Sequence, residues 1–128
     1  MSKNNNRYSK EIPRKDSKRK SYALMLVKKY PKIKERIERG ESVNGRDQAI
    51  YQVVSGAIYK TKFLPNGYDI LEFIERKYWK HEEITVEEYA AEKVVDPKTV
   101  VNWLYGFTNM VLNDFGAEQM NYLKAVML

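Results

Sequence analysis

Five residues in the C-terminal third of the chain have side chains that can contact the edges of nucleic-acid bases, by hydrogen bonds or, for valine, by apolar contact. They are Lys98, Thr99, Val101, Asn102 and Tyr105. Asparagine bonds adenine through two hydrogen bonds, lysine reaches guanine or a phosphate, and threonine meets a base edge or the methyl group of thymine. We expect all five to lie on the outward side of one helix, where they would face a DNA groove.

Two closely spaced helix starts would position these residues. Thr85 precedes Glu88 by three residues, the spacing of a capping box, so a helix is expected to begin at Val86. Asp96 before Pro97 suits an N-cap followed by the first residue of a second helix. This spacing predicts a short helix, a tight turn and a longer helix, as in helix-turn-helix DNA-binding units.

The second helix also needs an apolar row that packs against the rest of the protein. Val100, Trp103, Leu104, Phe107 and Val111 recur at helical spacing. Any helical bundle needs such a row, so it fits two packed helices without a ligand equally well. The outward residues alone favour a DNA-binding unit.

The periodicity of the whole chain predicts an all-α fold, a small helical bundle with a C-terminal helix-turn-helix and a disordered basic N-terminal arm. Pro31 should interrupt the first helix, Gly40 should end it, and Gly67 should supply positive φ in a Pro-Asn-Gly turn. Gly116 should end the last long helix. Four segments follow: an arm over 1–17, N-terminal helices over 18–64, a helix-turn-helix domain over 65–115, and a terminal helix over 116–128. The expected helices before the capping box are Lys18–Lys29, Lys32–Arg39, Arg46–Lys62 and Asp69–Lys80.

Positive charge is concentrated at the N-terminus. Residues 1–20 contain eight Lys and Arg against two acidic residues, and the first 39 residues have a net charge of +10 against −4 for the remainder. A basic arm favours a polyanionic partner, although a solubilising tail has the same composition. We expect phosphate contacts from Arg7, Ser9-Lys10, Arg14, Lys15, Lys18, Arg19, Lys20, Lys28 and Lys29.

The helix-turn-helix region itself is acidic. Residues 82–118 contain eight Asp and Glu but only Lys93 and Lys98, and phosphate neutralisation normally supplies much of the affinity for DNA. Lys93 and Val94 also occupy the turn where such motifs usually have an apolar residue and then glycine. These features leave two alternatives open: a protein-interaction adaptor or inhibitor, and a small terminase-type DNA-packaging subunit.

The segment FIERKYWKHEEITVEEYAAEKVVDPKTVVNWL resembles phage late-gene regulators of the RinA/ArpU kind, whose C-terminal part is similar to region 4 of sigma factors. The matching features are the aromatic helix end at Tyr78-Trp79, the Thr85-capped helix and the helix entry Val95–Val100. The resemblance covers roughly residues 21–115. It implies an activator of phage late genes that binds double-stranded DNA and acts with the host RNA polymerase.

Several classes of protein are disfavoured by the composition. His81 is the only histidine, cysteine is absent, and no phosphate-binding loop, nucleophile-base pair or metal motif occurs, so we expect neither an enzyme nor a cofactor or metal site. No apolar run approaches the length of a membrane span, and a cytoplasmic location is expected. A homodimer is expected if the DNA target is palindromic, with the terminal helix as its interface because Met120, Leu123, Val126 and Met127 share one face.

Overall fold

The computed structural model describes the backbone of residues 16–127 and the side chains of residues 18–116. The regular elements in this part of the chain are all helices and it contains no strand, which confirms the predicted all-α class. The predicted disordered arm, residues 1–17, lies outside the residues whose side chains are described. The elements are α1 (Asp16–Glu38), α2 (Gly45–Thr61), α3 (Gly67–Ile74), the π-helical turn η2 (Glu75–Trp79), α4 (Val86–Lys93) and α5 (Pro97–Met127).

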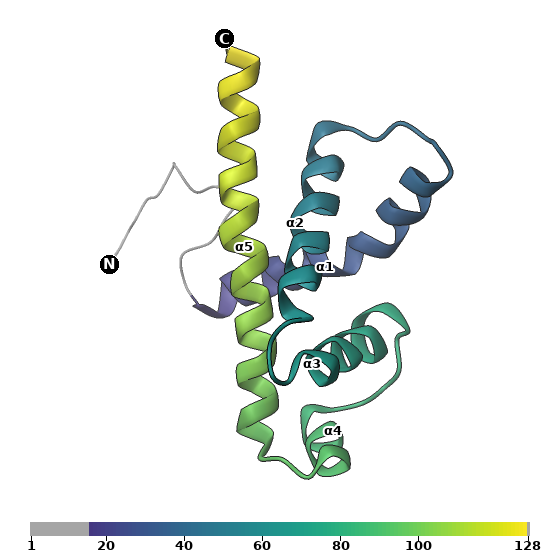
Figure 1. Cartoon of the computed structure of the whole chain (residues 1–128), viewed down its shortest axis with the longest axis vertical. Coiled ribbons are helices and arrows are strands. Elements are labelled where there is room, and N and C mark those ends of the chain that lie inside the picture. Colours follow the sequence, from purple (N-terminus) through teal and green to yellow (C-terminus); the bar gives the residue numbers. More distant parts are fainter. Residues whose placement is uncertain (1–15, 128) are drawn as a thin grey trace.

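Helix α5 is the element on which the other helices pack. It contacts α1, α2, α3 and α4, and Figure 1 shows it running along almost the whole length of the molecule. One continuous core unites the described helices, so segments 18–64 and 65–115 share their buried residues. Fully buried members from successive helices include Leu26, Val54, Phe73, Tyr89, Phe107 and Phe115.

Helix α1 runs through Pro31 without interruption, so the predicted break there is wrong. A proline has no N–H, which deprives the carbonyl four residues earlier, that of Val27, of its helical donor. The indole Nε1 of Trp79 donates to this Val27 oxygen at 2.9 Å. Because a donor from η2 replaces the missing one, the carbonyl is satisfied and the helix continues past the proline.

Gly40 ends α1 as predicted. Its φ is 81°, its N–H donates to the Ile37 oxygen at 2.9 Å, and the N–H of Glu41 donates to the Arg36 oxygen at 3.0 Å. This pair of bonds is a Schellman motif, which satisfies the last carbonyls of the helix.

Gly67 has a different role from the one predicted. The Pro-Asn-Gly segment is a turn, but Gly67 does not have positive φ and is instead the first residue of α3. A Cβ at this position would overlap the carbonyl oxygen of Thr61. The glycine is therefore needed for close approach of two backbone segments.

Gly116 does not end α5, which continues to Met127. A glycine stops a helix chiefly by adopting positive φ, and among the described glycines only Gly40 does so. The predicted terminal helix is therefore a continuation of α5. The side chains of its predicted apolar face, residues 120–127, lie outside those that the structure describes.

The bond from Trp79 to Val27 predicts coupling between Trp79 and Pro31. Trp79→Phe should lower the free energy of unfolding by about 1–2 kcal/mol because a buried carbonyl loses its donor. In a Pro31→Ala background the alanine N–H replaces that donor, and the same substitution should cost clearly less. Urea denaturation of the four proteins in this double-mutant cycle measures the coupling; strictly additive effects would contradict it.

Two glycine substitutions should have opposite effects on stability. Gly67→Ala should destabilise the fold by about 1–3 kcal/mol because the new methyl group displaces the backbone at Thr61. Gly56→Ala, within α2, meets nothing within 4 Å and should stabilise it by roughly 0.5–1 kcal/mol. Thermal melting followed by circular dichroism compares them, and equal melting temperatures would refute the packing argument.

Candidate nucleic-acid interface

The capping box at the start of α4 forms as predicted. The Thr85 hydroxyl accepts a hydrogen bond from the Glu88 N–H at 3.0 Å, and the Glu88 carboxylate accepts one from the Thr85 N–H at 2.9 Å. Each side chain thereby satisfies a backbone donor that the helix leaves unpaired. The helix begins at Val86, as the sequence indicates.

The turn after α4 is built without glycine. Val94 adopts the left-handed conformation with φ 58° and ψ 49°. The N–H of Val94 donates to the Ala91 oxygen at 3.2 Å and that of Val95 to the Ala90 oxygen at 3.0 Å, which is again a Schellman pattern. Left-handed backbone costs a β-branched residue roughly 1–2 kcal/mol. The valine at this position therefore makes the turn more costly than a glycine would, although the left-handed cap forms.

Helix α5 begins at Pro97, capped by Asp96. The Asp96 carboxylate accepts from the Lys98 N–H at 2.8 Å, and its backbone oxygen accepts from the Thr99 N–H at 2.8 Å. The predicted inward row is buried at four positions and half-buried at the fifth. The buried members are Val100, Leu104, Phe107 and Val111, and the half-buried one is Trp103.

The outward residues of α5 divide into two groups. Lys98, Val101 and Asn102 are exposed, and at spacings of three and four residues they form one stripe along the first turns of the helix. Thr99 and Tyr105 are half-buried and border this stripe. The Lys98 ammonium makes no ion pair with any described residue, so its charge is available to a ligand.

Helix α4 is fixed against α3 by a buried tyrosine and the charges around it. The Tyr89 hydroxyl donates to the Glu72 carboxylate at 2.7 Å and lies 2.9 Å from the Asp69 backbone oxygen. The Lys93 ammonium lies 2.9 Å from the same Glu72 carboxylate. Burial, followed by the bond to Glu72, raises the pKa of Tyr89, while the bonds from Tyr89 and then Lys93 lower the pKa of Glu72. No local pattern predicts this cluster, because its α3 and α4 members are separated by 17 residues or more.

Several acidic residues of the region are engaged within the molecule. The Arg76 guanidinium bonds Glu82 at 3.0 Å and Glu92 at 2.8 Å, which raises the pKa of Arg76. Lys93, one of the two lysines in the acidic segment 82–118, likewise forms an ion pair within the molecule, with Glu72. The net charge of the segment therefore overstates the number of free carboxylates facing a partner.

The candidate phosphate-contacting residues are only partly described. Lys28 is exposed and lies with Lys77 and Thr85 in the wall of one shallow cavity at the start of α4. Its ammonium is 5.9 Å from the centre of the Tyr78 ring, as is that of Lys77. Lys18 and Lys29 are exposed, and Arg19 and Lys20 are half-buried. Arg7, Ser9-Lys10, Arg14 and Lys15 lie outside the described residues.

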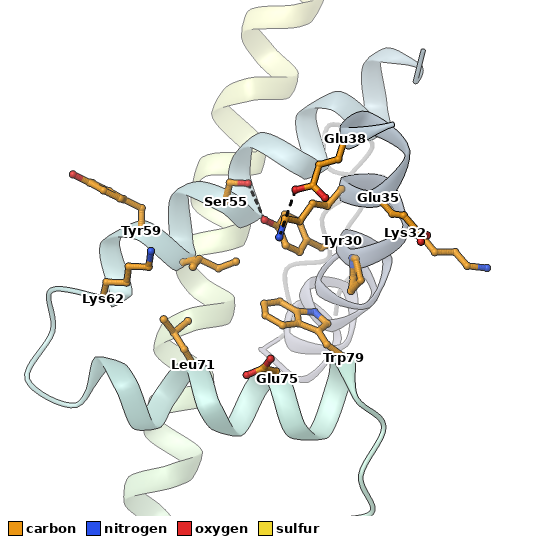
Figure 2. A pocket seen from close by; sticks show the side chains of 13 residues that line it. Tyr30, Lys32, Glu35, Glu38, Ser55, Tyr59, Lys62, Leu71, Glu75 and Trp79 are labelled. Atoms are coloured by element: carbon orange, nitrogen blue, oxygen red, sulfur yellow. Dashed lines mark hydrogen bonds and ion pairs between the residues drawn. The ribbon is translucent and has the colours of Figure 1, made fainter. Parts of the chain in front are cut away.

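A groove lined by residues of α1, α2, α3 and η2 was not anticipated. Its floor is apolar and aromatic, from Tyr30, Ile58, Leu71 and Trp79. Figure 2 shows the groove bordered by α1, α2 and the α3–η2 segment. Tyr30 packs against Trp79 with ring centres 5.6 Å apart, and its hydroxyl lies 3.1 Å from that of Ser55. The apolar residues were recognisable as core positions, but their incomplete burial depends on how α1 and α2 diverge.

Among the described residues, no helix is both long and apolar enough to cross a membrane. No group of three or more His, Asp or Glu residues in that part of the chain could hold a metal ion. Comparison with known proteins finds no matching family model, no matching curated protein and no matching solved structure.

The Glu72 cluster predicts acid sensitivity. Because folding lowers the pKa of Glu72, its stabilising contribution is fully present above the unfolded pKa of about 4.5 and is lost as pH falls from there through the lower folded-state pKa. Glu72→Gln should lower the free energy of unfolding by about 1–2 kcal/mol at pH 7 and by progressively less as the pH is lowered from 4.5 toward 3. Urea denaturation at both pH values measures this. Glu75→Gln, in the next turn, is the control; an equal loss at both pH values for Glu72→Gln would contradict the assignment.

Proposed function

We propose that this protein is a sequence-specific DNA-binding transcription regulator in which α4, the turn at Val94 and α5 act as a helix-turn-helix. One observation is the main support: Lys98, Val101 and Asn102 form an exposed stripe at the start of a capped helix. A recognition helix needs this arrangement, because its first turns enter the major groove while its other side packs on the protein.

In this proposal each exposed residue has a distinct contact. Asn102 bonds the edge of an adenine, Val101 packs on a thymine methyl group, and Lys98 reaches guanine or a phosphate. Thr99 and Tyr105, at the border of the stripe, make flanking contacts. The Tyr89–Glu72 bond supports the site by holding α4, and with it the start of α5, against α3.

The positive charge needed for affinity comes from outside the acidic segment. Lys28 lies beside the start of α4. In this proposal it contacts the DNA phosphates that flank the major groove. The basic residues before α1 supply further phosphate contacts, as N-terminal arms do in other DNA-binding proteins. The resemblance to phage regulators extends the proposal to activation of late genes with host RNA polymerase. In that case the exposed Glu87 carboxylate of α4, together with the exposed Glu83 just before the helix, meets a basic surface on the polymerase.

A protein-interaction adaptor is the second candidate, and exposed aromatic residues favour it. Tyr59, Phe63 and Tyr68 are 63%, 72% and 76% exposed, and all lie near the connection between α2 and α3. Exposed apolar groups gathered in one region are typical of protein-binding surfaces. Salt separates the two functions, since DNA binding weakens steeply as salt rises, whereas an apolar contact does not.

Selection of bound sequences from random DNA duplexes tests the proposal. Asn102→Ala should change the preferred base at one position, with a loss of about 1–3 kcal/mol in discrimination. Asn113→Ala, an exposed asparagine farther along α5, is the matched control and should leave the preference unchanged. Deleting residues 1–15 should weaken all sequences similarly and reduce the salt dependence of binding. Recovery of no enriched sequence with the intact chain would refute the proposal.

A further inference from the structure

The groove between α1 and α2 has the composition of a binding site for a helix. Its volume is about 800 Å³, and Ile58, Leu71 and Trp79 on its floor are only partly buried. Lys32, Lys34 and Lys62 on its edges are balanced by Glu35, Glu38 and Glu75, so a polyanion gains little there. An apolar floor with balanced charged edges suits the apolar side of an amphipathic helix.

The same chain has a helical end that projects beyond the neighbouring helix α2. Helix α5 continues beyond Gly116 to Met127, and Figure 1 shows this end extending past the N-terminal end of α2. In the sequence of this end, Met120, Leu123 and Met127 recur at helical spacing. In proteins most of the stability of a helix comes from packing of its apolar side rather than from intrinsic propensity.

We infer that the groove of one copy binds the end of α5, residues 117–127, from a second copy. None of the described residues that line the groove belongs to α5. Since α5 is one uninterrupted helix anchored by Phe107, Val111 and Phe115 in its own core, its end cannot fold back into the groove of the same molecule. A second copy supplies the missing occupant.

Reciprocal exchange closes the assembly as a two-fold dimer. Each copy contributes one groove and one helix end, so the contact is formed twice. Doubling matters because a stable interface needs about 800 Å² per partner, more than one short helix provides. The inference does not depend on DNA binding, and the dimer is measured in the absence of DNA.

Sedimentation equilibrium of the full chain tests the inference. We expect a concentration-dependent species of twice 15.1 kDa. Leu71→Lys, on the groove floor, should raise the dimer dissociation constant at least about tenfold. Met25→Lys replaces a residue that is 37% exposed on α1 but does not line the groove, and it should leave the constant unchanged. A monomer at every concentration would overturn the inference.

A peptide competition keeps the test decisive if Leu71→Lys fails to fold. Trp79 and Trp103 are the two tryptophans of the chain, so Trp103→Phe makes Trp79 the single reporter in the groove. A synthetic peptide of residues 116–128 should shift the Trp79 emission and convert the dimer to a monomer. A dimer that the peptide neither dissociates nor perturbs at Trp79 would show that the α5 ends pair with each other, and would overturn the groove assignment. Neither result bears on sequence selection by Asn102.

Discussion

The bond from the Trp79 indole to the Val27 carbonyl determines how the two halves of the molecule meet. Pro31 leaves that carbonyl without a donor, and a buried carbonyl without a partner is costly. The donor comes from η2, the segment that leads into α4. One hydrogen bond therefore keeps α1 continuous and fixes its position against the element before α4. The groove follows from the same contact, because Trp79 forms part of its floor while the second half of α1 forms one edge.

Polar contacts around α4 show why net charge is a poor guide to a surface. Arg76 and Lys93 bond four acidic groups on α3, α4 and the connecting segment, which fixes the short helix in place. A helix of eight residues has little stability of its own, so these contacts and the capping box substitute for length. The exposed stripe on α5 then depends on polar groups that do not themselves face a ligand.

Local signals in the sequence predicted the helix boundaries that depend on local chemistry. Thr85, Asp96 and Gly40 each act through bonds to residues within five positions, and all three formed as expected. The failures at Pro31 and Gly116 have the opposite origin. Pro31 is accommodated by a donor 48 positions away, and Gly116 retains helical geometry because nothing local imposes positive φ. The exposed side of α5 followed from its periodicity, whereas the groove depends on the angle between two helices, which periodicity does not encode.

The continuity of α5 makes it a rigid rod about 46 Å long. Its first turns and its last turns keep a fixed rotational relation, because a helix advances by about 100° and 1.5 Å per residue. A single inserted residue near Asn113 would leave both ends chemically intact yet turn one against the other by more than a quarter of a circle. In a dimer assembled through the C-terminal ends of α5, the length of this helix would set the distance and the angle between the exposed stripes of the two copies. Evolution of such a chain would therefore tolerate substitutions along α5 far more readily than changes in its length.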